Sequence, residues 1–275
     1  METSARTGRP LVTARNAAVW AVLRRELDRH AGRELTVLDV GGGTGGFAVP
    51  LAEAGHTVTV IDASPDALAA LTRRAADAGV ASRVRAVQGD GDALASLVEP
   101  GSADLVLCHS VLEVVDDPAR VVAAIAAALR PGDAAPRPGG AALQPGDAAP
   151  RPGGAALRPG GAVSLLVASR AAAILGRAIN GHLSAAAALV TDPAGRSGPR
   201  DTLLRRYDAD SATALLETAG LTVEQTHGVR VVADLLPATV LEEDPRAVLE
   251  LELELSSRPP FRDMASQLHL FARLS

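Results

Sequence analysis

The sequence predicts an α/β fold in which a mostly parallel sheet of seven strands has helices on both faces and an antiparallel last strand. Short runs rich in Val, Ile and Leu alternate with Ala-rich stretches of helical length. These runs are apolar on both faces, which is typical of strands buried between two helical layers. The final apolar run is interpreted as a strand antiparallel to the one before it.

The first half of the chain contains five apolar runs. Pro65 and Pro118 each stand in the first turn of an expected helix, where a missing N–H is not needed. We expect strands at 35–40, 57–62, 83–88, 103–109 and 162–169, and helices at 46–54, 65–78 and 118–129.

The second half of the chain is less regular. "LELELEL" alternates like a strand, but Leu and Glu favour a helix and Asp244-Pro245 starts one well, so we expect a helix. A capping Asp208 or Asp210 starts another helix, which ends at Gly220. The remaining expectations are a helix at 171–190, a polar Arg-rich loop at 191–206 and strands at 221–236 and 268–274.

Composition narrows the classes of protein. The formal net charge is −5, and all 27 basic residues are arginine, so a general nucleic-acid binder is not favoured. No apolar run reaches the length of a membrane span, and the N-terminus lacks the apolar segment of a signal peptide. Cys108, the single cysteine, suits a reducing cytoplasm. We expect a cytoplasmic protein with no membrane partner and no metal.

The stretch "LTVLDVGGGTGG" (35–46) is the most informative part of the chain. A buried strand leads through Asp39 to the alternating glycines Gly41, Gly43 and Gly45. Glycine allows positive φ and a close approach of the backbone to a ligand, and the next helix directs free N–H groups at that ligand. The same letters match G-x-G-x-x-G, which nicotinamide and flavin proteins share.

Polar residues follow the next strands. Asp62 ends the strand 57–62, 21 positions after Gly41, where a carboxylate can accept both hydroxyls of a ribose; the alternative is a cap on the following helix. Gly91 and Asp92 in "VQGDGDAL" could contact an adenine, or belong to an ordinary turn. His109 leaves the fourth strand at its carboxyl end, where ligands bind in open α/β sheets. Cys108 is interpreted as a core residue.

The set of these motifs resembles class I S-adenosylmethionine-dependent methyltransferases. "VLDVGGGTG", the acid ending the second strand, "GDGDAL", "ADLVLCHSVLEVVDDP" and "LRPGG" occur in the order and spacing of that family across about residues 35–168. The resemblance implies a Rossmann-like fold, S-adenosyl-L-methionine as cofactor and direct in-line methyl transfer to an oxygen or nitrogen acceptor. If that acceptor is a carboxylate no general base is needed, so no catalytic residue is named; His109 or Glu113 could serve a hydroxyl.

A closer resemblance extends over more of the chain. "RNAAVW", "HSVLEVVDDP", "THGVRVVADLL" and "AVLELELELSSRPPF" are similar to the bacterial tRNA 5-carboxymethoxyuridine methyltransferase family, which methylates a carboxylate on a wobble uridine. By matching position, the resemblance implies that Arg15 reaches the methionine carboxylate of the cofactor. It further implies contacts to methionine from Gly41 and Gly42, to ribose from Asp62, to adenine from Gly91 and Asp92, and to the methionine end from His109.

The acceptor side is less defined by the sequence. Residues 170–210 are expected to form a substrate-side helix and an Arg-rich loop, in which Arg205 and Arg206, with Arg196 and Arg200, contact phosphates or are simply solvated. Arg230 could clamp a substrate carboxylate or form a structural ion pair. The acceptor is therefore a tRNA or a small molecule.

A nicotinamide oxidoreductase and a noncatalytic cofactor-binding module remain as alternatives. The oxidoreductase is less favoured, because lysine is absent and there is no Tyr-Lys pair for hydride transfer.

Two near-identical 14-residue units, "RPGDAAPRPGGAAL" and "QPGDAAPRPGGAAL", occupy residues 130–157. Without them the chain runs from a helix through "RPGG" directly into the strand 162–169. We therefore interpret 130–157 as a flexible tandem-repeat insertion in the turn before the fifth strand of a single domain, 1–275. Longer loops add little closure entropy, so such an insertion is tolerated.

Overall fold

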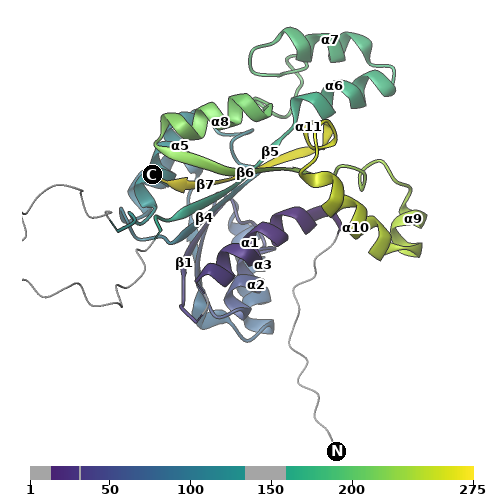
Figure 1. Cartoon of the computed structure of the whole chain (residues 1–275). Coiled ribbons are helices and arrows are strands. Elements are labelled where there is room, and N and C mark those ends of the chain that lie inside the picture. Colours follow the sequence, from purple (N-terminus) through teal and green to yellow (C-terminus); the bar gives the residue numbers. More distant parts are fainter. Residues whose placement is uncertain (1–13, 31, 134–158) are drawn as a thin grey trace, which may run out of the picture.

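The computed structural model describes residues 14–30, 32–133 and 159–275, and these form one seven-stranded sheet with the order β3-β2-β1-β4-β5-β7-β6 (Figure 1). Every neighbouring pair is parallel except the two pairs that contain β7. The predicted fold class, including the antiparallel last strand, is confirmed. The strands are β1 (Thr36–Val40), β2 (Thr57–Asp62), β3 (Val84–Gln88), β4 (Leu105–His109), β5 (Ala162–Ala168), β6 (Leu221–Val229) and β7 (Gln267–Leu274).

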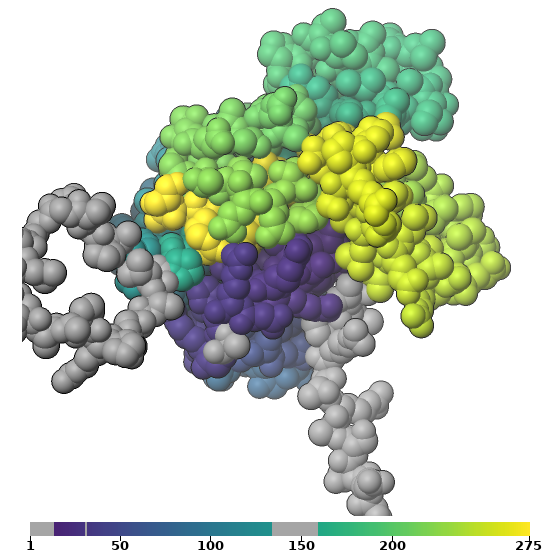
Figure 2. Space-filling model, viewed as in Figure 1, coloured from purple at the N-terminus to yellow at the C-terminus, as the bar shows by residue number. Residues whose placement is uncertain are grey.

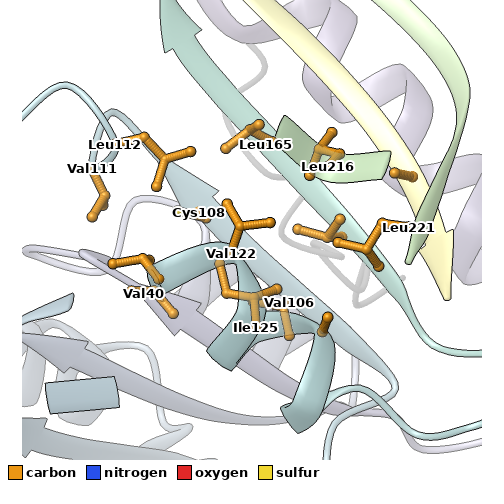
Figure 3. Close-up of a cluster of buried hydrophobic side chains, with 14 of the residues drawn as sticks. Val40, Val106, Cys108, Val111, Leu112, Val122, Ile125, Leu165, Leu216 and Leu221 are labelled. Carbon is orange, nitrogen blue, oxygen red and sulfur yellow. The ribbon is translucent and has the colours of Figure 1, made fainter. Parts of the chain in front are cut away.

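Helices cover both faces of the sheet, and each face has its own hydrophobic core. Helices α1 (Ala17–Arg29), α2 (Ala48–Glu53) and α3 (Pro65–Asp77) pack on one face. Helices α4 (Leu94–Leu97), α5 (Pro118–Ala128) and α8 (Ala209–Thr218) pack on the other. The second core is drawn in Figure 3, where Cys108 lies fully buried among aliphatic side chains.

The remaining helices lie beyond the carboxyl ends of β5 and β6. Figure 2 shows α6 and α7 (teal to green) and α9 and α10 (yellow-green) projecting from the body on the same side of the molecule. Their bounds are α6 (Arg170–Ile179), α7 (Leu183–Thr191), α9 (Ala238–Glu243), α10 (Pro245–Ser256) and α11 (Phe261–Met264). Three short 3-10 turns are η1 (Ala14–Asn16), η2 (Ala81–Arg83) and η3 (Gly91–Ala93).

Two expected elements are wrong in extent. The expected helix 171–190 is a pair, α6 and α7, because Gly181 at φ +77° interrupts it. The expected strand 221–236 ends at Val229, because Arg230 adopts φ +59° and turns the chain. The helix expected for "LELELEL" is confirmed as α10, with Asp244 as its N-cap: the Ala247 N–H donates to the Asp244 carboxylate at 3.0 Å.

The repeat lies almost wholly outside the described residues, since these stop at 133 and resume at 159. On the described flanks, the Gly161 N–H donates to the Arg130 carbonyl at 2.8 Å. Residues 130 and 161, on the two sides of the repeat, are therefore direct neighbours. The insertion within one domain stays a prediction.

Candidate active site

The carboxyl ends of β1, β2 and β4 meet at one edge of the sheet, where the strand order reverses and open α/β sheets bind ligands. A cavity of about 360 Å³ opens there, within the size range of small-molecule sites. The predicted residues Gly41, Asp62, Gly91 and Asp92 all line it. The other lining residues are Val40, Ile61, Ala63, Gly89, Asp90, Ser110, Val111, Val114 and Val115.

The glycine loop exposes its backbone at this edge. Gly41 and Gly43 have φ of +70° and +54°, a conformation that favours glycine. A Cβ on Gly41 would collide with the Val111 side chain. A Cβ on Gly42 would lie 2.5 Å from Oδ2 of Asp39 and 2.9 Å from Cγ1 of Val60. The loop has no room for side chains at Gly41 and Gly42.

Asp39 is a buried carboxylate beneath this loop. Its exposed fraction is 2%, and its Oδ2 has no hydrogen-bond partner in the described part of the chain. Burial, followed by the nearby charge of Asp62, raises the pKa of Asp39 to about 7. Asp39 is not among the residues that line the cavity. Buried polar atoms are normally partnered, so this oxygen is available to a cationic or hydrogen-donating group that approaches the loop.

Asp62 is fixed by two backbone amides. The Gly43 N–H donates to Oδ2 at 2.8 Å, and the Ser64 N–H donates to Oδ1 at 2.9 Å. Each carboxylate oxygen keeps a lone pair that can accept a further hydrogen bond. The cap of α3 is Ser64, whose Oγ accepts from the Ala67 N–H at 3.2 Å. Asp62 is therefore not needed as the helix cap, and it remains free to bind a diol.

His109 stands at the end of β4 against aromatic neighbours. Its ring lies edge-on to Phe47, with centroids 4.7 Å apart, and Phe47 stacks on Trp20 of α1 at 5.1 Å. Burial lowers the pKa of His109 to about 4, so the imidazole is neutral at pH 7. His109 is placed between the glycine loop and β5 rather than in the lining of the cavity.

Two predicted arginines far apart in the chain meet at a carboxylate that sequence reasoning missed. The Nε of Arg15 lies 3.6 Å from Asp234, and a guanidinium nitrogen of Arg230 lies 3.7 Å from the same carboxyl group. Both arginines keep substantial exposure, at 59% and 37% of their side chains. Two cations sharing one anion leave an excess positive charge beside the end of β6.

Glu252 of α10 holds the loop that carries Arg230. It is 2% exposed and accepts from three successive backbone N–H groups, those of Val231, Val232 and Ala233, at 3.0, 2.8 and 2.6 Å. No sequence signal singles it out within "LELELEL". Burial on one side of the helix, which only the fold decides, separates it from the exposed Glu250 and Glu254.

Arg205 and Arg206 have partners inside the protein. Arg205 donates to the carbonyls of Leu112 at 2.9 Å, Asp116 at 3.0 Å and Val115. Arg206 is buried and pairs bidentately with Asp201 at 2.6 and 2.9 Å. These contacts argue against the expected substrate role for both, whereas Arg200 is exposed on the same loop.

Glu113 is also buried, with a carboxylate that is only partly used. Its Oε1 accepts from the Ala168 N–H at 2.6 Å, and its Oε2 has no partner among the described residues. Burial raises the pKa of this carboxyl group above its usual range.

Within residues 14–30, 32–133 and 159–275, no cluster of three or more His, Cys, Asp or Glu could hold a metal ion. No helix in those ranges is long and apolar enough to span a membrane.

Residues 37–132 match the family described as methyltransferase domain. The chain is similar to the tRNA 5-carboxymethoxyuridine methyltransferase of Escherichia coli strain K12, with 28% identity over 94% of this chain and 87% of that protein. The chain is an S-adenosylmethionine-dependent methyltransferase. The ubiquinone biosynthesis O-methyltransferase of Ralstonia nicotianae is 43% identical to this methyltransferase, but over only 35% of this chain and 39% of that protein.

Solved structures share the fold of this methyltransferase. A putative sarcosine dimethylglycine methyltransferase from Galdieria sulphuraria superposes with a TM-score of 0.56 at 14% identity, covering 94% of this chain and 86% of that one. The magnesium protoporphyrin IX methyltransferase of Synechocystis, solved with bound S-adenosylhomocysteine, superposes with the same score at 15% identity, covering 95% and 84%. The Rossmann-like class I architecture is thus confirmed.

Proposed function

We propose that this methyltransferase esterifies the carboxylate of a 5-carboxymethoxyuridine in tRNA. The observation that carries the proposal is the extent of the likeness to the Escherichia coli tRNA enzyme. It runs over 94% of the chain and therefore extends well beyond the methyltransferase domain at 37–132. The segment beyond that domain supplies Arg230, which meets Arg15 and Asp234 beside the carboxyl end of β6.

The residues of the ligand edge fit S-adenosyl-L-methionine. The unpartnered Oδ2 of Asp39 suits the ammonium of the methionine part, which Gly41, Gly42 and Gly43 allow to approach closely. In the cavity, Asp62 accepts the ribose hydroxyls, while Gly91 and Asp92 contact the adenine. Arg15 pairs with the methionine carboxylate, and His109 lies near the same end. Since Arg15 then binds the cofactor, the positive charge of Arg230 is available to bind the carboxylate of the acceptor.

The cofactor supplies a methyl group on a positively charged sulfur, which is reactive without help from a base. A carboxylate oxygen of the acceptor attacks the methyl carbon in line and forms a C–O bond. The C–S bond breaks, its electron pair stays on sulfur, and a methyl ester and S-adenosylhomocysteine result. No proton moves, so the protein has only to orient the acceptor about 3 Å from the methyl group and exclude water.

The decisive experiment incubates the full-length protein and methyl-labelled cofactor with tRNA from a host strain lacking this gene. We expect label in tRNA that mild alkali releases as methanol, as a methyl ester requires. Because tRNA is the acceptor, the reaction belongs in the cytoplasm. Label that appears only in a parallel small-molecule extract would overturn the tRNA proposal in favour of a small-molecule acceptor. The likeness to ubiquinone O-methyltransferases, confined to about a third of the chain, leaves that outcome open to test.

A matched pair of variants tests the role of Arg230. Arg230→Met removes one charge-assisted pairing with the acceptor carboxylate, so kcat/KM for tRNA should fall about 10- to 100-fold. The affinity for S-adenosylhomocysteine should stay unchanged, since Arg230 does not hold the cofactor. The control is Arg246→Met on α10, whose side chain is 87% exposed and pairs with Glu250. Equal kcat/KM for the two variants would contradict the role of Arg230.

A further inference from the structure

A chain of buried polar side chains crosses three strands and ends at His109. The Nε2 of His109 on β4 lies 2.9 Å from Oγ of Ser164 on β5, and the same Oγ lies 2.8 Å from Nε2 of His269 on β7. Strand pairing places all three on one face of the sheet, because Leu166 pairs with both His109 and His269 and lies two residues from Ser164. Ser164 and His269 are both fully buried.

The single hydroxyl proton of Ser164 makes the chain directional. If this hydroxyl donates to one imidazole, the other imidazole must donate to it, so the two histidines carry opposite tautomers. Both are neutral at pH 7, because burial lowers the pKa of His109 to about 4 and holds that of His269 well below its usual range. Neither Nδ1 has a partner within the described residues. If Ser164 donates to His269, the unpartnered Nδ1 carries a proton on His269 and is bare on His109. If Ser164 donates to His109, the unpartnered Nδ1 carries a proton on His109 and is bare on His269.

Burial selects between the two directions. An unpartnered buried N–H is rarer in proteins than an unpartnered acceptor. His269 is fully buried in the middle of the sheet, whereas His109 is less buried and ends β4 next to Ser110 of the cavity lining, although its Nδ1 is covered as well. The unpartnered N–H is better placed on His109, because this ring lies nearer than His269 to the cavity in which a ligand oxygen or a bound water would accept from it.

We propose that Ser164 and His269 are positioning residues that fix His109 as the Nδ1–H tautomer and so make it a hydrogen-bond donor toward the methyl-transfer site. The His269 Nε2–H donates to Ser164, and the Ser164 hydroxyl donates to Nε2 of His109. The remaining Nδ1–H of His109 recognises an acceptor oxygen of the bound ligand. Only this last step rests on the proposed function, because the tautomer exists without any ligand.

The test is two-bond ¹H–¹⁵N NMR of the ¹⁵N-histidine-labelled full chain, with and without S-adenosylhomocysteine. The chain has six histidines, which single substitutions assign. We expect His109 to show a protonated Nδ1 and a bare Nε2 before ligand is added. A protonated Nε2 on His109 in the wild-type protein would overturn the proposal whatever the variants do. Loss of methyl transfer to tRNA would bear on the proposed function alone.

Variants test the hydrogen-bonded series His109–Ser164–His269 itself. Ser164→Ala should convert His109 to a mixture of tautomers and lower S-adenosylhomocysteine affinity or kcat about three- to tenfold, the size of one hydrogen bond. Ser164→Thr keeps the hydroxyl and should restore the wild-type spectrum. His227→Phe is the control, since the His227 ring packs 6.0 Å from that of His269 but is not part of the chain. A His109 tautomer unchanged by Ser164→Ala, in protein with a native circular dichroism spectrum, would refute the positioning role.

Discussion

The two sides of the ligand edge are built in different ways. On the side proposed for the cofactor, the loops after β1, β2 and β3 place residues of the cavity lining within a few positions of each strand end, among them Gly41 of the glycine loop. On the side proposed for the acceptor, side chains are held by partners on other elements. The loop that carries Arg230 is held by Glu252 of α10, and Arg205 binds the carbonyls of Leu112 and Asp116, 93 and 89 positions earlier in the chain.

This difference teaches where substitutions act. A change on the cofactor side alters the shape of a backbone cradle and should be felt first by the cofactor. A change on the acceptor side removes a contact between residues that are distant in the sequence. It should therefore lower the affinity for the acceptor or the stability of the 192–234 region and leave the affinity for the cofactor unchanged. Four predictions test this contrast, beginning with the largest expected effect.

Arg206 is expected to matter for stability rather than for the acceptor. Arg206→Ala removes two charge-assisted hydrogen bonds from the Asp201 carboxylate and leaves it the Arg177 guanidinium at 3.8 Å and the Ser197 donors, so the free energy of unfolding should fall by about 3–5 kcal/mol. Arg206 also holds the pKa of Asp201 well below its usual range, so this loss should shrink at strongly acidic pH. Chemical denaturation measures it. Arg200→Ala, at an exposed site of the same loop, should change stability by less than about 0.5 kcal/mol. Equal stabilities would return Arg206 to the list of acceptor contacts.

Asp39 should make the stability of the cofactor side depend on pH. Its folded pKa of about 7 lies above its ordinary value of 3.8, so the folded state binds the proton more tightly. The stabilisation of the folded state by protonated Asp39 is complete below about pH 4 and is lost as the pH rises toward 7. The free energy of unfolding should fall by up to about 4 kcal/mol over this range, at about 1.4 kcal/mol per pKa unit.

The measurement compares denaturation of the wild type and Asp39→Asn from pH 4 to 8, where the wild type should lose more stability. S-adenosylhomocysteine, whose ammonium favours ionised Asp39, should release a proton on binding near pH 6.5. Calorimetry in buffers of different ionisation enthalpy detects this release, and zero proton exchange would contradict an ammonium site at Asp39.

Glu252 should act mainly on the acceptor side. Glu252→Ala leaves three N–H groups of the 231–233 loop without their acceptor, which should lower the free energy of unfolding by about 3 kcal/mol and raise the KM for tRNA through a displaced Arg230. The affinity for S-adenosylhomocysteine should fall much less. Glu254→Ala, at the exposed neighbour on α10, is the control and should change stability by under about 1 kcal/mol. Equal losses of cofactor and tRNA affinity would remove the contrast between the two sides.

Gly42 gives the smallest expected change in stability and the sharpest test of the cradle. In Gly42→Ala the new methyl group meets the Asp39 carboxylate and Val60, so stability should fall by about 1–3 kcal/mol. S-adenosylhomocysteine affinity should fall together with it. Gly46→Ala is the matched control, since a Cβ there meets nothing within 4 Å. Isothermal titration of both variants decides the matter, and indistinguishable affinities would show that the ligand does not approach Gly42.

The sequence by itself determined the order and type of most strands and helices, and the positions of Gly41, Asp62, Gly91 and Asp92 around one cavity. These features are local, because apolar runs dictate buried strands and a parallel sheet brings the residues after each strand to the same edge. The break at Gly181 was also local, and the Asn-Gly pair that causes it is visible in the sequence.

Only the tertiary structure decided which charged side chains are free and which are used. Arg205 and Arg206 resemble Arg200 in the sequence, yet the first two have internal partners while Arg200 is exposed. Glu252 differs from Glu254 only in the side of α10 on which it lies. The partner of a charge is set by which elements pack together, and neighbouring letters in a sequence do not record this.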